Sequence, residues 1–405
     1  MQKKFRTALA IFSTLIFFSC RSTKQEIPLE IERTPEETTL EIVFAGDVMA
    51  HTQNFQLHDF SMIWDDIRDD VSKSDFAFAN LEAPVNPDSP FESYPNFNMQ
   101  PSYPQAMFDA GFNLISLANN HTDDQEPQGI HETQKWAEGV AKETSKSARP
   151  IYFSGIVKDG EFTFEQISWE EYKILFIAAT EFMNTWRDYE HVNIIIPTKK
   201  GRDAFVKRIE KMKKDFSPDL FLVSVHTGEE EYVMTVKESV RKFYHDLIDA
   251  GADIVVSNHP HVIRPIEYIG EMNDFKRQGS SASEDAEEPK KPKVRKAIMY
   301  ANGNTISGQR RSLDYENPDD IWQYTGDGQI VSMRFSRDEK GFFLADSKVQ
   351  FITTFTPEGF KGPIIKKLNG NFISSLEAQG KAKDAKYYRA RLDALKKVEE
   401  IHTWQ

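Results

Sequence analysis

The sequence repeats one arrangement five times: an apolar run that favours a β-strand ends in residues able to bind a metal ion. Carboxylates, carboxamides and imidazoles supply the oxygen and nitrogen atoms that divalent cations bind. One strand or helix cannot surround two ions that lie about 3.5–4 Å apart, so such a site needs ligands from several strand ends. The sequence therefore predicts a dinuclear metal site built from FAGDV (44–48), ANLE (79–82), ANNH (118–121), VHTG (225–228) and SNHPH (257–261).

The pattern of apolar residues predicts an α/β fold. From residue 40 onwards, continuous apolar runs rich in β-forming residues alternate with amphipathic stretches. Continuous apolar strands are typical of sheets covered on both faces. We expect strands at 40–45, 76–79, 113–117, 174–178, 220–225, 254–256 and 298–301, an antiparallel pair at 329–335 and 342–355, and helices at 105–110, 128–146, 202–215, 236–250 and 382–400.

Residues 1–20 have the pattern of a bacterial lipoprotein signal peptide. A basic start is followed by an apolar run over 8–18, which at about 11 residues is short for a bilayer span. The run ends at Cys20, the only cysteine, so an intrachain disulfide and a cysteine-based zinc site are excluded. We expect an exported protein anchored to the membrane at the cell envelope through lipidated Cys20. A buried helix over the apolar run is the alternative.

Composition divides the remaining chain into four parts. Residues 21–38 are polar and predict a tether, and 39–356 contain the main domain. Within that domain, residues 273–296 are poor in apolar side chains and predict an exposed charged insertion, while 357–405 predict a C-terminal helical tail. The net charge is −13 and no long basic run is present, which argues against nucleic acid as a partner.

The segment around residue 120 combines a ligand with an acid. Asn120 could donate its carbonyl oxygen to a cation. The neighbouring His121, paired with Asp123, could protonate a leaving group, a role that needs a pKa near neutrality. The alternative is an asparagine-rich turn with an exposed histidine.

Three further histidines complete the expected nitrogen ligands. His259 and His261 lie two positions apart around a stiffening proline, and His226 follows another apolar run. Neutral imidazoles in this arrangement bind metals well. The histidines expected to be solvated or on helix surfaces are those at 51, 58, 131 and 245.

Two acidic residues complete the set, although each has an ordinary alternative. Asp47 follows a strand and could lie in a turn, and Glu82 could cap a helix. Neither residue is specific by itself.

In this order, the segments resemble the CapA family, named for a capsule and poly-γ-glutamate synthesis protein and related to calcineurin-like metallophosphoesterases. The resemblance covers about 40–306, and the glutamates at 229–231 leave open which carboxylate matches the fourth motif. The motifs are FAGDVM (44–49), NLE (80–82), LANNH with Asp123 (117–123), HTG with Tyr232 (226–232), DAGAD to HPHV (249–262) and YANGN (300–304).

The resemblance implies a calcineurin-like metallophosphoesterase sandwich of two facing mixed sheets flanked by helices. It also implies two divalent ions, Mn, Fe or Zn, with His121 as the acid beside them. The residues implied as metal ligands are Asp47, Glu82, Asn120, His226, His259 and His261.

Two functions of different class follow. The first is a metal-dependent hydrolase that cleaves a phosphoester or an amide during synthesis or processing of poly-γ-glutamate or a related capsule polymer. The second is a non-catalytic, membrane-anchored assembly factor for export of an anionic polymer. The expected partners are the membrane, an anionic envelope polymer or phosphoester substrate, and capsule synthesis subunits.

Overall fold

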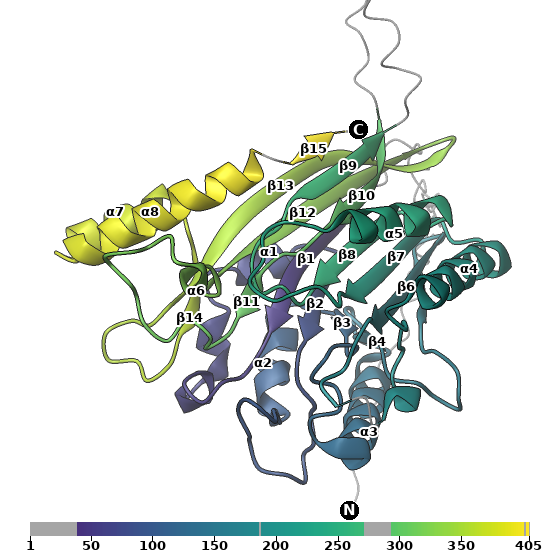
Figure 1. Ribbon diagram of the computed structural model, residues 1–405, viewed down its shortest axis with the longest axis horizontal. Helices are drawn as coiled ribbons and strands as arrows, with labels where there is room; N and C mark the ends of the chain where they lie inside the picture. The colour runs from purple at the N-terminus through teal and green to yellow at the C-terminus, as the bar shows by residue number, and fades with distance from the viewer. Residues whose placement is uncertain (1–38, 186–187, 271–292, 401, 405) are drawn as a thin grey trace, which may run out of the picture.

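The computed structural model describes residues 39–185, 188–270, 293–400 and 402–404, whose strands form two mixed sheets (Figure 1). The first sheet has the order β14 (Ile364–Lys367), β13 (Gly341–Phe355), β12 (Asp327–Asp338), β1 (Leu40–Val48), β2 (Phe76–Leu81), β3 (Leu114–Ser116) and β4 (Tyr152–Ser154), with β11 (Asn304–Ile306) paired to β1 outside this order. The second has the order β15 (Thr403–Trp404), β9 (Ile266–Gly270), β10 (Val294–Met299), β8 (Ile254–Asn258), β7 (Leu220–His226), β6 (Tyr172–Thr180) and β5 (Glu165–Trp169).

Helices flank the sheets, and Figure 1 shows α4 and α5 lying along the strands of the second sheet. The expected α/β architecture of two mixed sheets flanked by helices is confirmed. The α-helices are α1 (Arg68–Ser72), α2 (Ser102–Asp109), α3 (Glu126–Thr144), α4 (Lys199–Phe216), α5 (Glu238–Asp249), α6 (Ile321–Tyr324), α7 (Gly370–Ala378) and α8 (Ala382–Glu399), and the short 3₁₀ helices are η1 (Asn54–Gln56), η2 (Phe60–Ile63) and η3 (Tyr189–His191).

The second sheet is buried on both faces, as its continuous apolar strands predicted. Along β6, Phe176 packs in the core between the sheets, whereas Ile177 packs with the helices on the other face. The ring of Phe176 meets that of Phe78 from the first sheet at 6.0 Å between centroids. Because successive strand residues point to opposite faces, one apolar run supplies both cores.

The helices predicted at 105–110 and 236–250 correspond to α2 and α5, and Gly111 and Gly251 follow just beyond their ends. Both glycines have positive φ, +112° and +114°. Beyond each one the chain turns back, and the N–H of Ala252 donates to the carbonyl of Leu247 after α5. This left-handed end is the one that glycine favours, and it leads directly into the next strand.

Parts of the predicted domain boundaries change. The segment 357–405 contains α7 and α8, but β14 and β15 each add a strand to a sheet, so it is more than a helical tail. The predicted insertion at 273–296 lies outside the described residues up to 292, and its last residues belong to β10. The predicted signal peptide and tether, 1–38, also lie outside the described residues. Across the described residues, no helix has the length and apolar character needed to cross a bilayer.

Parallel strands point their carboxyl ends toward one edge of each sheet. In the first sheet, β1, β2 and β3 are parallel neighbours. In the second, β6, β7 and β8 are parallel neighbours. Loops at the carboxyl ends of parallel strands are where α/β proteins place their binding sites.

Candidate metal centre

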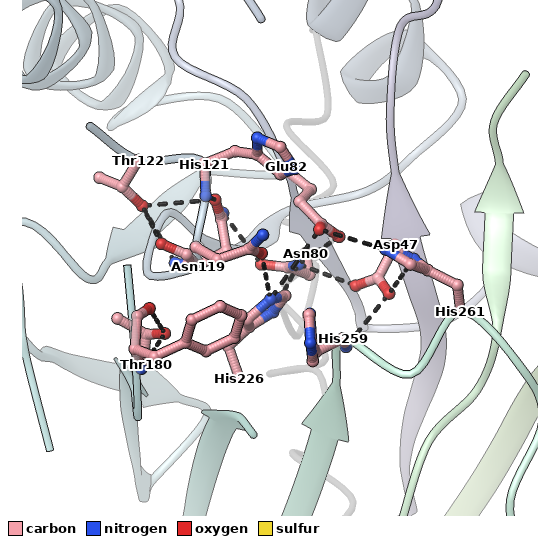
Figure 2. Close-up of polar contacts among 12 residues, drawn as sticks. Asp47, Asn80, Glu82, Asn119, His121, Thr122, Thr180, His226, His259 and His261 are labelled. Carbon is pink, nitrogen blue, oxygen red and sulfur yellow. Dashed lines mark hydrogen bonds and ion pairs between the residues drawn. The ribbon is translucent and has the colours of Figure 1, made fainter. Parts of the chain in front are cut away.

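Both sheets contribute side chains to one buried cluster, shown in Figure 2. Asp47 lies at the end of β1, and Glu82 directly follows β2. His226 ends β7, while His259 and His261 follow β8. We call these five residues the metal centre, and each is at most 2% exposed. The structure thus brings together five of the six ligands implied by the sequence.

Two glycines allow the backbone approach that positions Asp47. A Cβ at Gly46 would lie 1.9 Å from the carbonyl oxygen of Gly303, and Gly303 itself has φ +68°. The close contact lets the N–H of Asp47 donate to the Gly303 carbonyl at 3.1 Å. A side chain at Gly46 would push β1 away from Gly303, and a Cβ at Gly303 would lie 2.7 Å from the carbonyl oxygen of Asp327 in a backbone conformation that favours glycine.

Glu82 belongs to two overlapping sets of donor atoms. One set joins it with His226 and His259, and the other joins it with Asp47 and His261. Within each set, the donor atoms lie within 4.8 Å of one another. Glu82 would therefore be placed to contribute to either set if divalent cations were bound there.

Burial and negative charge act together on Glu82. Burial raises the pKa of its carboxyl group well above the usual range, and the neighbouring Asp47 raises it further. Two carboxylates that are close together out of water repel each other unless positive charge lies between them. The electrostatics therefore favour a bound cation.

The pKa values of the three histidines shift in different directions. Burial lowers the pKa of His226 and His259 well below the usual value, which keeps both imidazoles neutral and able to bind a metal. Burial also opposes protonation of His261, but its hydrogen bond to Asp47 and the charge of that carboxylate outweigh burial and raise its pKa. His261 Nδ1 lies 3.3 Å from Asp47 Oδ2.

Buried polar atoms without hydrogen-bond partners indicate whether the cluster suits a metal ion. Among the described residues, buried Glu82 Oε1 and His259 Nδ1 have no hydrogen-bond partner. Native structures seldom leave such atoms unsatisfied without a ligand. His259 also has φ +103°, a strained conformation held at the cluster. The oxygen and nitrogen chemistry of these donors is compatible with divalent metal ions.

Asn120 joins the same cluster from the loop after β3. Its Oδ1 lies 2.7 Å from His226 Nε2, as expected for the sixth implied ligand. Sequence reasoning missed Asn80, which donates from Nδ2 to Asp47 Oδ1 at 2.8 Å and lies opposite Asp47 in the β1–β2 register. The NLE motif contained the signal, since Asn80 is two residues before Glu82.

The predicted pairing of His121 with Asp123 is wrong. His121 Nδ1 lies 2.7 Å from Asp124 Oδ2, and both side chains are buried. Asp123 instead accepts a hydrogen bond from Thr185. The turn after β3 rotates successive side chains in different directions, so Asp124 orients the imidazole.

The three glutamates at 229–231 divide their roles. Glu229 forms a buried ion pair with Arg264. Glu230 is exposed and pairs with Lys237 at 3.3 Å. Glu231 is exposed and contributes a donor atom to a third set with His259 and His261, so it is the carboxylate that belongs to the site.

A cavity of about 450 Å³ opens beside the metal centre. His121, His261 and Glu231 line it. His51, expected to be solvated, lines it as well and is half-buried; burial lowers its pKa to about 3. No sequence pattern identified His51 as a residue of the site. Its position depends on a contact with a segment far away in the sequence, where the N–H of Gly308 donates to His51 Nδ1 at 3.1 Å.

The fold and site define an α/β protein of two mixed sheets with a buried cluster compatible with divalent metal ions. Residues 41–309 match the family described as bacterial capsule synthesis protein PGA_cap. The match covers more than half of the chain, and the protein belongs to this family. The expected CapA relationship is thereby confirmed.

Two relatives carry the same relationship. The chain is 25% identical over 271 residues to "PGA biosynthesis protein CapA" of Bacillus subtilis (strain 168), covering 64% of this chain and 67% of the relative. It is 27% identical over 173 residues to "Capsule biosynthesis protein CapA" of Bacillus anthracis, covering 40% of this chain and 38% of the relative.

Two solved structures were also matched. One is a hypothetical protein from Thermus thermophilus, with TM-score 0.41, 15% identity, and coverage of 77% of this chain and 98% of that chain. The other is calcineurin-like phosphoesterase YfkN from Bacillus subtilis, with TM-score 0.41, 12% identity, and coverage of 87% and 99%. Similarity at this level supports no inference about the chemistry of the present chain.

Proposed function

We propose that this protein is a metal-dependent hydrolase of the cell envelope that acts in the synthesis or processing of poly-γ-glutamate or a related capsule polymer. Membership of the capsule synthesis family supports the process. The observation that carries the hydrolase proposal is the buried Glu82 carboxylate, shared by two sets of donor atoms. A purely structural carboxylate would have hydrogen-bond partners for both oxygens, and Glu82 Oε1 has none among the described residues.

Asp47, Glu82 and the three histidines would hold the two cations, with Asn120 beside His226. When bound, two divalent cations make water a nucleophile at neutral pH and polarise a phosphoester or amide oxygen.

The chain itself supplies the proton. His121 borders the cavity next to His261, and its Nδ1 is held by Asp124 at 2.7 Å. Held in this way, the protonated imidazole has Nε2–H left to donate to the leaving group. Asp124 fixes the orientation of the imidazole.

Metal content tests this proposal first. The protein, purified without chelator and analysed by elemental mass spectrometry, should carry close to two transition-metal ions per chain and hydrolyse bis-para-nitrophenyl phosphate. His259→Ala should lose metal and turnover, whereas His131→Ala, at an exposed position on α3, should keep both. A protein that takes up no Mn²⁺, Fe²⁺ or Zn²⁺, or an unchanged turnover in His259→Ala, would refute the hydrolase proposal.

A non-catalytic assembly role is the second candidate. The names of both relatives describe biosynthesis, which favours a role in building polymer. Polymer levels in cells that carry His121→Ala separate the two candidates. Full polymer production in cells whose variant has lost hydrolysis would favour assembly.

The location and partners are also proposals. We propose export and anchoring through lipidated Cys20, contact with capsule synthesis subunits, and no binding of nucleic acid. The basic start, the short apolar run and the single cysteine support anchoring. Cys20→Ser should move the protein from the membrane fraction to the soluble envelope fraction; retention in the membrane fraction would contradict lipidation.

A further inference from the structure

We propose that Arg311 and Lys361 form a binding site for an anionic group of the substrate at a distance from the bond that is cleaved. The ligand class is a chain that carries repeated carboxylate or phosphate groups. This inference rests on the proposed function in one respect, that a bond of the substrate is cleaved at the metal centre. The binding site itself rests on the shape and charge of a second cavity.

The second cavity, of about 770 Å³, adjoins the one beside the metal centre. Arg311, His51 and Tyr94 line both cavities. Lys361 lines the second cavity only. A substrate whose reacting bond lies near His261 could therefore extend past Arg311 toward Lys361.

The two cations are available for binding. Within the described parts of the chain, neither Arg311 nor Lys361 forms an ion pair. Arg310, which also lines the cavity, is instead committed to Asp327 at 2.9 Å. The one carboxylate among the described lining residues, Asp384, accepts a hydrogen bond from Tyr315. Both side chains are exposed and line one cavity without an ion-pair partner among the described residues, so an anionic group is the ligand whose charge complements them.

Exposed aromatic rings border the path between the cavities. Tyr94 is 68% exposed and Trp322 is 52% exposed, and both line the cavity beside the metal centre. Exposed rings of this kind offer contact area to the uncharged parts of a ligand while their polar atoms stay in water. The cavities thus combine apolar contact with positive charge, which suits a chain rather than a small ion.

This site lies outside the part of the chain that matches the family, which ends at residue 309. Arg311 and Lys361 both follow that position, and Tyr388 of α8 completes the far wall. The carboxyl-terminal segment therefore adds a feature that family membership does not supply.

Calorimetric titration of the metal-loaded protein tests the inference. The probes are a hexamer of γ-linked glutamate and a hexamer of glycerol phosphate, which distinguish carboxylate from phosphate. The double variant Arg311→Gln/Lys361→Gln should lower the affinity for at least one probe by roughly tenfold or more, since each lost charge-assisted contact weakens binding. The dependence of the affinity on salt should fall with it.

The matched control removes two exposed lysines of α8, Lys396→Gln/Lys397→Gln, which line neither cavity. Equal affinities of the two double variants, or a parent protein that binds neither hexamer, would overturn the inference. Binding that depends on Arg311 and Lys361 in a parent protein without hydrolytic activity would support the site and refute only the hydrolase proposal.

Discussion

Two buried charged clusters among the described residues differ in how their carboxylates are satisfied. In the metal centre, Glu82 is 0% exposed, and its Oε1 has no hydrogen-bond partner among the described residues. In the second cluster, Asp327 is also 0% exposed, but it accepts hydrogen bonds from Arg310, Arg391 and Thr353 at 2.7–2.9 Å. We call these four residues the Asp327 cluster.

The comparison distinguishes the metal centre, a candidate binding site, from the Asp327 cluster, which stabilises the fold. Burial opposes the charged form of Arg391, but Asp327 outweighs burial and raises the pKa of the guanidinium group. Arg391 is on α8 and Asp327 on β12, so this ion pair fastens the carboxyl-terminal helix to the first sheet. A buried carboxylate with strong partners stabilises the fold, whereas one left with a free oxygen is ready for a ligand.

Glu82→Gln should have the largest effect on function. Loss of the shared carboxylate weakens both cation sites, so bound metal should fall from near two ions per chain toward zero. Turnover should fall by about a thousandfold or more, as expected when the activated nucleophile is lost. Elemental analysis and hydrolysis of bis-para-nitrophenyl phosphate provide the readouts.

The metal-free Glu82→Gln protein should be at least as stable as the metal-free parent, because the repulsion between Asp47 and Glu82 is removed. Glu230→Gln, at an exposed glutamate of the neighbouring loop, is the control. Two retained ions in Glu82→Gln would break the distinction between the clusters.

Asp327→Asn should instead lower stability. Removing one partner from a buried ion pair leaves uncompensated charge and costs about 3–5 kcal/mol. Denaturant unfolding of the metal-free protein measures this loss, while the metal content of the remaining folded protein should stay near that of the parent.

Asp346→Asn removes an exposed carboxylate that pairs with Arg334 at 3.1 Å. Its effect should be below about 1 kcal/mol. If Asp327→Asn were equally mild, the Asp327 cluster would have no special structural role.

A third test compares the two aspartates that follow His121, Asp123 and Asp124. Asp124→Asn should reduce kcat by about tenfold to a hundredfold for substrates with poor leaving groups, because His121 loses the carboxylate that orients it. Substrates with a nitrophenol leaving group need little proton donation and should be affected less. Steady-state kinetics with both substrate types measure the difference.

Asp123→Asn is the matched control, since Asp123 contacts Thr185 rather than His121. Equal losses in the two variants would contradict the assignment of Asp124 as the positioning residue.

Glu165 belongs to neither cluster. Its substitution should have the smallest effect, a change in how stability depends on pH. Burial raises the pKa of its carboxyl group from 4.5 to about 7. Between these pH values the folded protein holds a proton that the unfolded chain releases, so stability falls as pH rises through this window. Allowing for the partial exposure of Glu165, the contribution should be about 1 kcal/mol.

Unfolding measured at pH 5 and pH 8 should show a smaller decline in Glu165→Gln than in the parent, with exposed Glu161→Gln as the control. Identical declines in all three proteins would show that Glu165 does not titrate with a raised pKa.

Local sequence patterns predicted much of this molecule. The continuous apolar runs identified the central parallel strands of both sheets, β1 to β3 and β6 to β8, since such runs are buried on both faces, whereas β4, β5, β9 and β11 were not predicted. The helix ends at Gly111 and Gly251 were predictable because a left-handed end favours glycine. The strands β14 and β15 were not predictable, because a strand of two to four residues carries too little periodicity to be recognised.

The sequence by itself determined the chemical character of the site: which strand ends carry oxygen and nitrogen donors, and that cysteine takes no part. Only the tertiary structure decided that Glu82 is shared by two donor sets, that Asp124 rather than Asp123 holds His121, and that Glu231 is the glutamate at the cluster. The physical reason is that donor identity is a local property of the chain. Distances between donors depend on the packing of two sheets whose contributing residues lie far apart in sequence, and on turns in which adjacent side chains point in different directions.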